Sequence, residues 1–391
     1  VYNIAISCCT KSHRWQIAIA LLDAMPEFLL APDDISCSAA INACRREGQW
    51  YPALALLEQM PEFRITPSII SCSAAISACQ GDSQWQLPLN LLKAMPELRV
   101  SLDIISCSAV ISVSEKAARW QLALAMLGST ANLRISIDAI GCNAAISACE
   151  KGCQWHISLA VLDFMPEFRV APDSVSCSAA ISASEKGGQW KVALALLSST
   201  PRLHIAPSDF SLNGAISACE KSGKWQFALD LLDCMPHFTV NPSIISCNAA
   251  ISASEKGGQW QLALALLKSM LHLRIPPDVI SCSATISACE KGGQWQVAIA
   301  LLTFMNELSL QPDAIVCNAA ISACEKCCQW QMALVLLGSL GKLCVVPDVI
   351  TYCAAISACE KGGQWRLALA LLSFMPKLRL SCNAISCNAA I

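Results

Sequence analysis

The tryptophans of this chain recur at one fixed interval. All eleven stand 35 residues apart, at Trp15, Trp50, Trp85, Trp120, Trp155, Trp190, Trp225, Trp260, Trp295, Trp330 and Trp365. An uninterrupted period of this length indicates a solenoid, in which each copy packs only on its neighbours. The usual expectation for 391 residues, about two or three compact domains, therefore does not apply.

One copy, residues 279–313, reads VISCSATISACEKGGQWQVAIALLTFMNELSLQPD, and we number its positions 1 to 35. A first helix is expected over positions 2–13, because a glycine pair such as Gly292 and Gly293 terminates helices. A second helix is expected from the Gln-Trp pair to the Met at position 27. Proline, which cannot continue a helix, follows that Met in several copies: Pro26, Pro61, Pro96, Pro166, Pro236 and Pro376.

Residues 1–383 thus divide into eleven tandem copies, of which the first lacks two residues, and residues 384–391 begin a truncated twelfth. The chain begins and ends partway through a copy, so we interpret it as a segment of a longer protein. Its composition, 54% hydrophobic and 14% charged, excludes disorder. Its longest apolar stretches, such as residues 262–267, fall short of the ~20 residues that span a bilayer, so no membrane partner is expected. No targeting peptide is visible in this segment.

The first helix has two contrasting faces. Positions 4, 7, 8 and 11, represented by Cys282, Ile286 and Cys289, form a core face of small residues and isoleucine. Positions 2, 5, 9 and 13 lie within an arc of about 80° on the opposite face. Position 5 is Asn or Ser in every copy but one, and position 9 is Ser except for Asn42.

The outer positions of this arc are equally regular. Position 2 is always apolar: Ile35, Ile70, Ile105, Ile140, Val175, Phe210, Ile245, Ile280, Ile315, Ile350 and Ile385. Position 13 is basic in ten of eleven copies, with Gly81 as the exception: Lys11, Arg46, Lys116, Lys151, Lys186, Lys221, Lys256, Lys291, Lys326 and Lys361.

Repeated along a solenoid, these positions form three parallel tracks. The apolar track can clamp base faces, the Asn, Ser and Asp side chains can hydrogen-bond base edges, and the cations can neutralise phosphates. Neighbouring helices pack ~8–10 Å apart, comparable with extended nucleotides, so one base per copy is feasible. The net charge of −2 by itself gives no indication of a nucleic-acid partner. However, the Glu at position 12 (Glu115, Glu150, Glu290) lies about 100° from each Lys on the helical wheel, which predicts a locally positive groove.

The unit resembles the pentatricopeptide repeat over essentially the whole chain. Shared features are the 35-residue length, the Pro-Asp end, the Val/Ile-Ser/Thr-x-Asn/Ser opening, Ile at position 8, Lys at position 13, the Ala-Leu-x-Leu-Leu second helix and Met at position 27. Uniform copies resemble the pure class of that family. The resemblance implies an all-α fold, a right-handed α-solenoid superhelix of about eleven helix–turn–helix repeats.

The resemblance also implies a base-reading rule, in which positions 5 and 35 of a copy select one base and position 2 sandwiches it. The pairs are Asn3 with Asp33, Ser38 with Ser68, Ser73 with Asp103, Ser108 with Asp138, Asn143 with Asp173, Ser178 with Ser208, Asn213 with Ser243, Asn248 with Asp278, Ser283 with Asp313, Asn318 with Asp348, and Cys353 with Asn383. In the family Asn with Asp implies U, Ser with Asp implies G, and Asn with Ser implies C. The expected target is 5′-U-n-G-G-U-n-C-U-G-U-n-3′.

The expected function is therefore sequence-selective binding of single-stranded RNA. The family acts in organellar RNA processing, stability, editing or translation, in the mitochondrion or chloroplast, and other RNA-processing proteins are conceivable partners. No enzyme activity, cofactor, metal or small-molecule substrate is expected of this segment. Two alternatives remain open: a protein-interaction scaffold like the tetratricopeptide repeats, and an enzyme whose catalytic domain lies outside the segment.

Each base-reading position also has a simpler interpretation. Asp at position 35 can be only a helix N-cap, Asn or Ser at position 5 only a solvated polar residue, and the basic track only a hydrated surface. Trp at position 17 and Met at position 27 are interpreted as packing residues. The five histidines share no position in the repeat, which gives no sign of a metal site.

The 25 cysteines follow the repeat, so we interpret them as reduced packing residues. Cys142 and Cys149, seven residues apart on one helix, would be separated by about 10.5 Å, too far for a disulfide. The spacings do not fit a zinc ribbon. The doublets Cys8 with Cys9 and Cys327 with Cys328 are the cysteines that we single out as candidates for another role.

Overall fold

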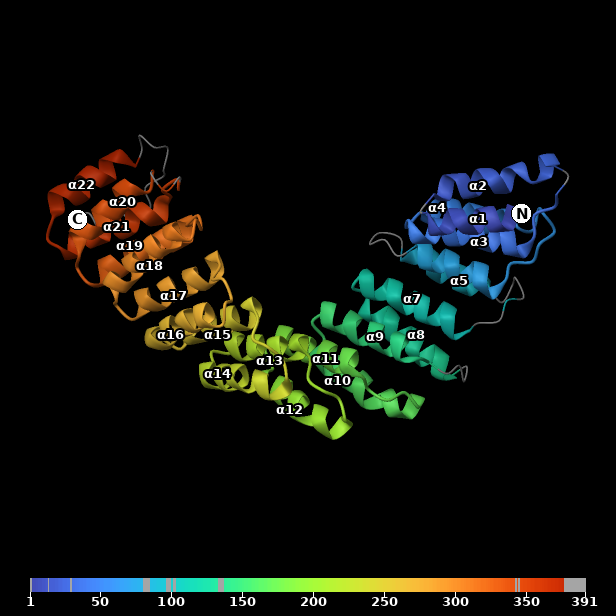
Figure 1. The fold of residues 1–391 in the computed structure, drawn as a ribbon, viewed down its shortest axis with the longest axis horizontal. Helices are drawn as coiled ribbons and strands as arrows, with labels where there is room; N and C mark the ends of the chain where they lie inside the picture. Colours follow the sequence, from blue (N-terminus) through green and yellow to red (C-terminus); the bar gives the residue numbers. More distant parts are fainter. Residues whose placement is uncertain are drawn as a thin grey trace. The chain divides into compact units, whose positions relative to one another are not determined.

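The computed structural model describes residues 2–12, 14–28, 30–79, 85–95, 100, 103–132, 137–341, 343 and 345–375. The regular structure within these ranges is entirely helical, with 22 α-helices and four short 3-10 helices (Figure 1). The chain divides into two compact units, residues 1–207 and residues 208–391. This confirms the all-α helical-repeat fold expected from the 35-residue period.

Each copy contributes a first and a second helix, which alternate along the chain. In the first unit the first helices are α1 (Tyr2–Lys11), α3 (Asp34–Arg46), α5 (Ile69–Ala78), α7 (Ile104–Lys116), α9 (Ala139–Lys151) and α11 (Ser174–Lys186). The second helices of this unit are α2 (Trp15–Ala24), α4 (Trp50–Gln59), α6 (Gln86–Ala94), α8 (Trp120–Asn132), α10 (Trp155–Phe164) and α12 (Trp190–Ser199).

The second unit repeats this alternation. Its first helices are α13 (Asp209–Lys221), α15 (Ile244–Lys256), α17 (Val279–Lys291), α19 (Ala314–Lys326) and α21 (Val349–Lys361). Its second helices are α14 (Trp225–Cys234), α16 (Trp260–His272), α18 (Trp295–Glu307), α20 (Trp330–Ser339) and α22 (Trp365–Phe374). Gly81 and residues 376–391, which include Asn383 and Ile385, lie outside the described residues.

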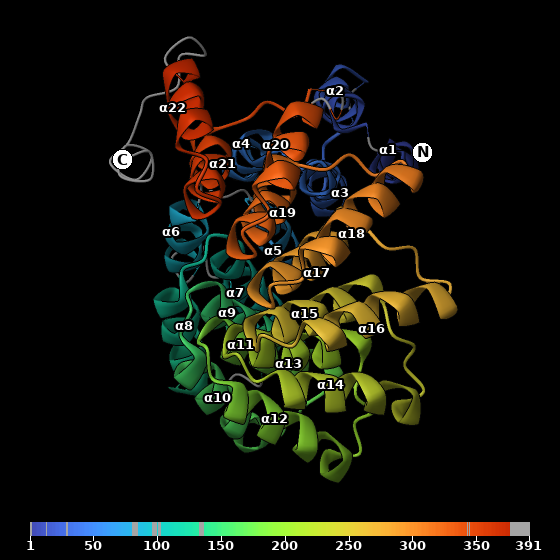
Figure 2. The same cartoon turned by 90° about the vertical axis from the view of Figure 1, so that its left-hand side faces the viewer.

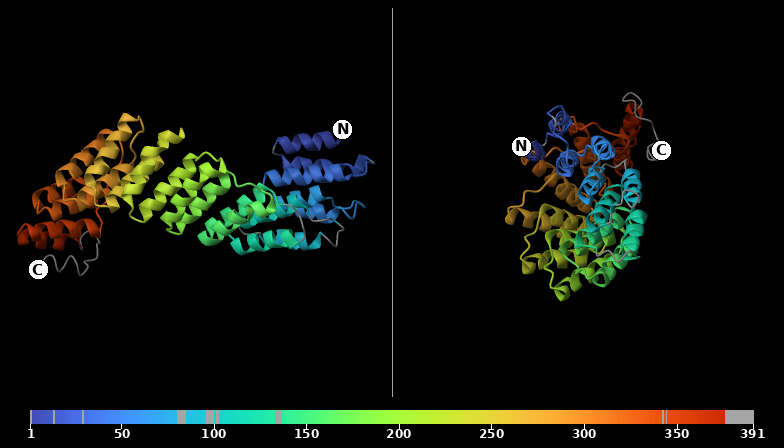
Figure 3. Two further views of the ribbon diagram at one scale, coloured as in Figure 1. Left: turned by 90° about the horizontal axis from the view of Figure 1, so that it is seen from below. Right: turned by 90° about the vertical axis from the view of Figure 1, so that its right-hand side faces the viewer.

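Within each unit the first helices contact one another in sequence order. In the second unit α15 contacts α17, and α17 contacts α19, and the three lie side by side in Figure 2. Within a unit, a second helix packs against its own first helix and the next one, as α10 does with α9 and α11. The helices of each unit therefore run alongside their neighbours (Figure 3), as expected of a solenoid.

The residue at position 35 sets where each first helix begins. From α3 to α21, the side chain of this residue accepts a hydrogen bond from the backbone N–H three residues further on; Asp278 accepts from Ser281 at 2.8 Å. In most copies the position-3 hydroxyl also accepts from the cap's own N–H, which completes a capping box. Helix capping by position 35, one of the two roles considered, is therefore confirmed.

The helices also end near the glycine and proline residues that were expected to terminate them. After α17, Gly292 is the C-cap and Gly293 has a φ of 65°, a conformation that glycine adopts without steric cost. Second helices end where proline follows position 27; the 3-10 turn Met165–Phe168, which contains Pro166, follows α10 directly. Where Leu271 or Asn306 replaces proline, α16 and α18 continue to His272 and Glu307. Pro96 and Pro376 fall outside the described residues.

The core face of the first helices is buried as expected. Position 8 is an isoleucine with no exposed surface in all eleven copies, from Ile6 to Ile356. Cys282 and Cys289 are also fully buried, and burial raises the pKa of each thiol to about 11. These cysteines are therefore protonated at neutral pH, and all 22 cysteines in the described ranges are free.

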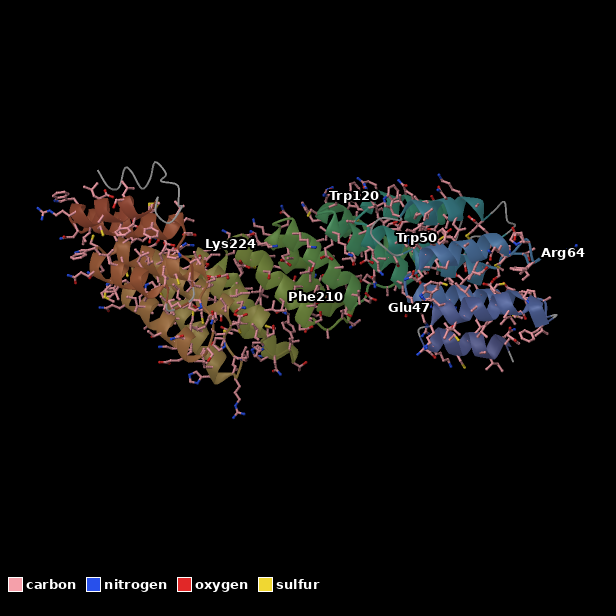
Figure 4. The ribbon with its side chains drawn as sticks, turned by 90° about the horizontal axis from the view of Figure 1, so that it is seen from above. Glu47, Trp50, Arg64, Trp120, Phe210 and Lys224 are labelled. Atoms are coloured by element: carbon pink, nitrogen blue, oxygen red, sulfur yellow. The ribbon has the colours of Figure 1, made fainter. Side chains whose placement is uncertain are left out.

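The tryptophans join consecutive copies. A Cβ built on Gly292 would lie 2.3 Å from Cδ1 of Trp260, which belongs to the preceding copy. Gly152 is equally close to Trp120, which is labelled in Figure 4. Trp365, which no described copy follows, is 60% exposed. The packing role expected of position 17 is therefore confirmed where the contact is seen: five indoles lie against the end of the next first helix, those of Trp120, Trp155, Trp225, Trp260 and Trp330.

None of the described helices is long and apolar enough to cross a membrane. Within the same residues, histidine, cysteine and acidic side chains do not gather in groups of three that could hold a metal ion.

Candidate nucleic-acid interface

The position-2 residues form a ladder of exposed apolar side chains. The ten described members, from Ile35 to Ile350, are between 57% and 67% exposed. Phe210, labelled in Figure 4, is the one aromatic member and is 60% exposed. Scattered apolar residues are common on protein surfaces, but a large exposed one at the same position of successive copies within each unit is a feature typical of binding surfaces.

The position-5 residues are less exposed than solvated side chains would be. Ser73, Ser108 and Asn318 are between 7% and 9% exposed, and most of the others are half-buried. They lie where adjacent first helices contact each other, so their polar atoms depend on partners within the protein. The interpretation of these residues as ordinary solvated polar groups is therefore wrong.

In four copies the position-5 asparagine donates to the position-35 aspartate. Asn248 Nδ2 lies 3.2 and 3.0 Å from the two carboxylate oxygens of Asp278. The same contact joins Asn3 to Asp33, Asn143 to Asp173 and Asn318 to Asp348, over distances between 3.1 and 3.4 Å. Residues 30 positions apart meet because the cap of one first helix lies beside the start of the preceding first helix.

The pairs with serine at position 5 behave less uniformly. Ser108 donates to Asp138 over 3.0 Å, whereas Ser73 donates to the carbonyl of Ile70 on its own helix. Ser38 donates to Asp34 rather than to Ser68. Ser178 and Ser208 belong to different units. The structure thus joins the two predicted base-selecting residues directly in the four Asn/Asp pairs and in one Ser/Asp pair.

Hydrogen bonding keeps the position-35 carboxylates charged. Burial alone raises the pKa of Asp173, but donation from the backbone N–H of Ser176 and from the amide of Asn143 lowers it below the ordinary value of 3.8. The pKa values of Asp33 and Asp348 are lowered for the same reasons. At neutral pH these side chains are therefore acceptors only, while the asparagine supplies the donors.

The basic track is paired with glutamates of neighbouring copies. Six lysines at position 13 lie 2.9–3.2 Å from the Glu at position 12 of the preceding copy. The pairs are Lys151 with Glu115, Lys186 with Glu150, Lys256 with Glu220, Lys291 with Glu255, Lys326 with Glu290, and Lys361 with Glu325. The lysine side chains are still 39–45% exposed.

This pairing corrects the expectation of a locally positive groove. On a single helical wheel Glu and Lys point in different directions, but adjacent first helices bring the Glu of one copy to the Lys of the next. Lys11 and Arg46 differ, since neither has an ion-pair partner within the described residues. Among the described residues, unpaired positive charge at position 13 is therefore seen in the first two copies.

Comparison with known proteins supports the repeat assignment. A family model described as the PPR repeat matches residues 1–28, 35–65, 210–239, 245–275 and 350–380. No curated protein sequence matches the chain. The matched segments keep the 35-residue phase, and the copies between them share the same tryptophan, isoleucine and capping positions.

Solved structures show the same fold. Two crystal structures of the pentatricopeptide repeat protein PPR10, each in complex with an 18-nt psaJ RNA element, are similar to the whole chain with a TM-score of 0.75 and 16% identity. The chain spans 57% of the length of those proteins. A structure of PPR10 from maize gives a TM-score of 0.53 and 18% identity, and the chain spans 70% of it. Five copies of this tandem array thus match the PPR repeat, and the chain shares the fold of the pentatricopeptide repeat protein PPR10 along its length.

Proposed function

We propose that the chain binds single-stranded RNA with one nucleotide per copy. The main support is that every described copy from the second onward presents an exposed apolar side chain at position 2. Such side chains can hold base faces on both sides, while the recessed pair at positions 5 and 35 meets the base edge. The RNA-bound state of the similar PPR10 structures supports this proposal.

We further propose that residues 1–383 read eleven nucleotides and that residues 384–391 begin a twelfth copy. With the family's rule, the target is 5′-U-n-G-G-U-n-C-U-G-U-n-3′, where n marks the Ser/Ser and Cys/Asn pairs. The array acts as a binding module rather than a catalyst, in RNA processing, stability, editing or translation within a mitochondrion or chloroplast. Other RNA-processing proteins are the expected further partners.

Selection from a random RNA pool with the purified chain tests the base assignment. The proposal expects enriched sequences to match the target in register, with U at the positions read by Asn/Asp pairs. Affinity should fall with salt, with a log–log slope of about −0.7 per phosphate neutralised. A chain that binds peptides but no single-stranded RNA would instead be a protein-interaction scaffold, and enrichment in another register would refute the base assignment alone.

A matched pair of substitutions in α17 tests the apolar ladder. Ile280 is 61% exposed and Ile286 is fully buried, six residues further along the same helix. Ile280→Ala should weaken RNA binding about five-fold, because the base loses an apolar contact, with little change in thermal stability. Ile286→Ala should instead cost about 2–5 kcal/mol of stability by opening a cavity. Unchanged RNA affinity in Ile280→Ala would exclude this face as the base-binding surface.

A further inference from the structure

At two places along the chain, position 3 of the following copy lies against both members of a base-selecting pair. The first place follows the fourth copy, where position 3 of the next copy is Gly141, which has no side chain. A Cβ on Gly141 would lie 3.2 Å from Oγ of Ser108 and 3.4 Å from Oδ1 of Asp138. A side chain at this position is therefore in contact with the two groups that read the base.

Thr351, at position 3 after the Asn318/Asp348 pair, makes this contact with hydrogen bonds. Its Oγ1 donates to Oδ1 of Asn318 at 2.6 Å, and the same hydroxyl lies 2.8 Å from Oδ1 of Asp348. Asn318 Nδ2 in turn donates to Asp348. The hydroxyl has a single hydrogen, so the contacts form an open chain in which Thr351 donates to Asn318 and Asn318 donates to Asp348, and both polar atoms of the amide have a partner.

Two other Asn/Asp pairs are followed by serine and lack the third contact. The hydroxyls of Ser176 and Ser281 donate to the backbone carbonyls of Asp173 and Asp278 at 2.8 and 2.9 Å. The Oδ1 atoms of Asn143 and Asn248 are buried and have no hydrogen-bond partner. These copies therefore keep one unsatisfied amide oxygen beside the carboxylate, which a base can reach only when the asparagine side chain turns, whereas the hydroxyl of Thr351 holds the oxygen of Asn318.

The difference determines which base edge the amide can satisfy. An asparagine whose Oδ1 is not held by the protein can turn to accept from the exocyclic amino group of cytosine, and through Nδ2 it can donate to the 4-carbonyl of uracil. An asparagine whose Oδ1 is already held by a hydroxyl presents chiefly its remaining N–H. The amino group of cytosine then meets no suitable acceptor on the amide, and a buried donor without a partner is costly.

We propose that position 3 of the following copy is a third specificity-determining position, and that Thr351 makes the Asn318/Asp348 copy discriminate more strongly against cytosine than the Asn/Asp copies followed by serine. This rests on the proposed RNA-binding function and on its assignment of one nucleotide to each copy. Thr351 acts through Asn318 and is a positioning residue.

Exchange of the two residue types between copies tests the proposal. The variants Thr351→Ser and Ser281→Thr keep a hydroxyl for helix capping, so circular dichroism and the thermal midpoint should stay close to those of the unsubstituted chain. The measurement is the dissociation constant of the full chain for target RNAs with U or C at the eighth nucleotide, read by Asn248, or at the tenth, read by Asn318.

The unsubstituted chain should prefer U over C more strongly at the tenth nucleotide than at the eighth. Thr351→Ser should lower the U-to-C affinity ratio at the tenth nucleotide about three- to ten-fold and leave the eighth unchanged. Ser281→Thr should raise the ratio at the eighth nucleotide alone. The fifth nucleotide, read by Asn143 in a copy that neither variant touches, is the internal control.

The outcomes distinguish failure of this proposal from failure of the proposed RNA-binding function. If both variants change the affinity for U and C by the same factor, or change neither, position 3 is only a capping position and the proposal is overturned while RNA binding stands. If the unsubstituted chain binds no single-stranded RNA, or shows no base preference at any of the three nucleotides, the proposed function is overturned and this inference with it.

Discussion

The first two copies and the later copies carry the same basic track in different electrostatic states. In α1 and α3 the cations at position 13 are Lys11 and Arg46, and position 12 is Thr10 or Arg45. In the described pairs of the later first helices, each lysine is bound to a glutamate from the copy before it. The charge that a phosphate meets is therefore set by position 12 of the neighbouring copy as much as by the lysine itself.

The contrast has a consequence for RNA binding. A phosphate that approaches Lys11 or Arg46 meets an unpaired cation, whereas one that approaches Lys256 competes with Glu220. Arg45, whose Nε donates to Asn42 at 2.7 Å, adds further positive charge beside Arg46. We therefore expect the phosphate contacts of the first two copies to contribute more to affinity than those of the later copies.

The largest expected effect comes from removal of the unpaired cations. Lys11→Ala combined with Arg46→Ala should weaken RNA binding about 10- to 50-fold at low salt and make the salt slope shallower by about 1.4. The matched variant removes one complete pair, Lys256→Ala with Glu220→Gln, and should change affinity less than about two-fold. Equal losses in the two variants, measured by salt titration, would remove the distinction between the two regions.

Release of the paired lysines should have the next largest effect, in the opposite direction. Glu220→Gln, Glu255→Gln and Glu290→Gln together free three lysines, so affinity should rise about ten-fold and the salt slope should steepen by about 2. Glu167→Gln with Glu307→Gln, which lie outside the ladder, control for the general change in charge. A gain no larger than in the control would show that these lysines do not reach the phosphates.

A smaller effect is expected when a cation of the first two copies is given a glutamate partner like those in the later copies. Thr10→Glu would place a carboxylate at position 12 of the copy before Arg46 and should weaken RNA binding about three-fold. Thr10 also donates to the carbonyls of Ile6 and Ala39, so Thr10→Gln is the control for loss of those bonds. If both variants lose affinity equally, the change reflects the altered helix contact and not the new charge.

The smallest effect concerns stability at high pH. The hydrogen bond to Glu325 raises the pKa of Lys361 above 10.5, so this stabilisation is present below that pH and is lost as the pH rises through the folded-state pKa. The lysine side chain is 44% exposed, which limits the contribution to less than about 1 kcal/mol. Urea unfolding at pH 9 and above pH 11 should show a smaller loss in Glu325→Gln than in the unsubstituted chain; an identical loss would mean that the pair does not stabilise the fold.

The period and polarity of the sequence were sufficient to predict the helices and both faces of the first helix. Isoleucine at position 8 is buried and apolar residues at position 2 are exposed, because both follow from the geometry of one helix. The pairing of Lys291 with Glu255, and the contact of Thr351 with Asn318, could not be predicted in this way. They depend on how far one first helix is displaced along its neighbour, which a helical wheel does not contain.

The contact between each tryptophan and the next copy has an evolutionary consequence. The indole of Trp225 meets Gly257 much as that of Trp330 meets Gly362, so these junctions are chemically alike. Unequal recombination that removed or duplicated one whole copy would rejoin surfaces that already fit, without a compensating mutation. The length of the recognised RNA could then change by a single nucleotide per event, which is a simple route by which such arrays acquire new targets.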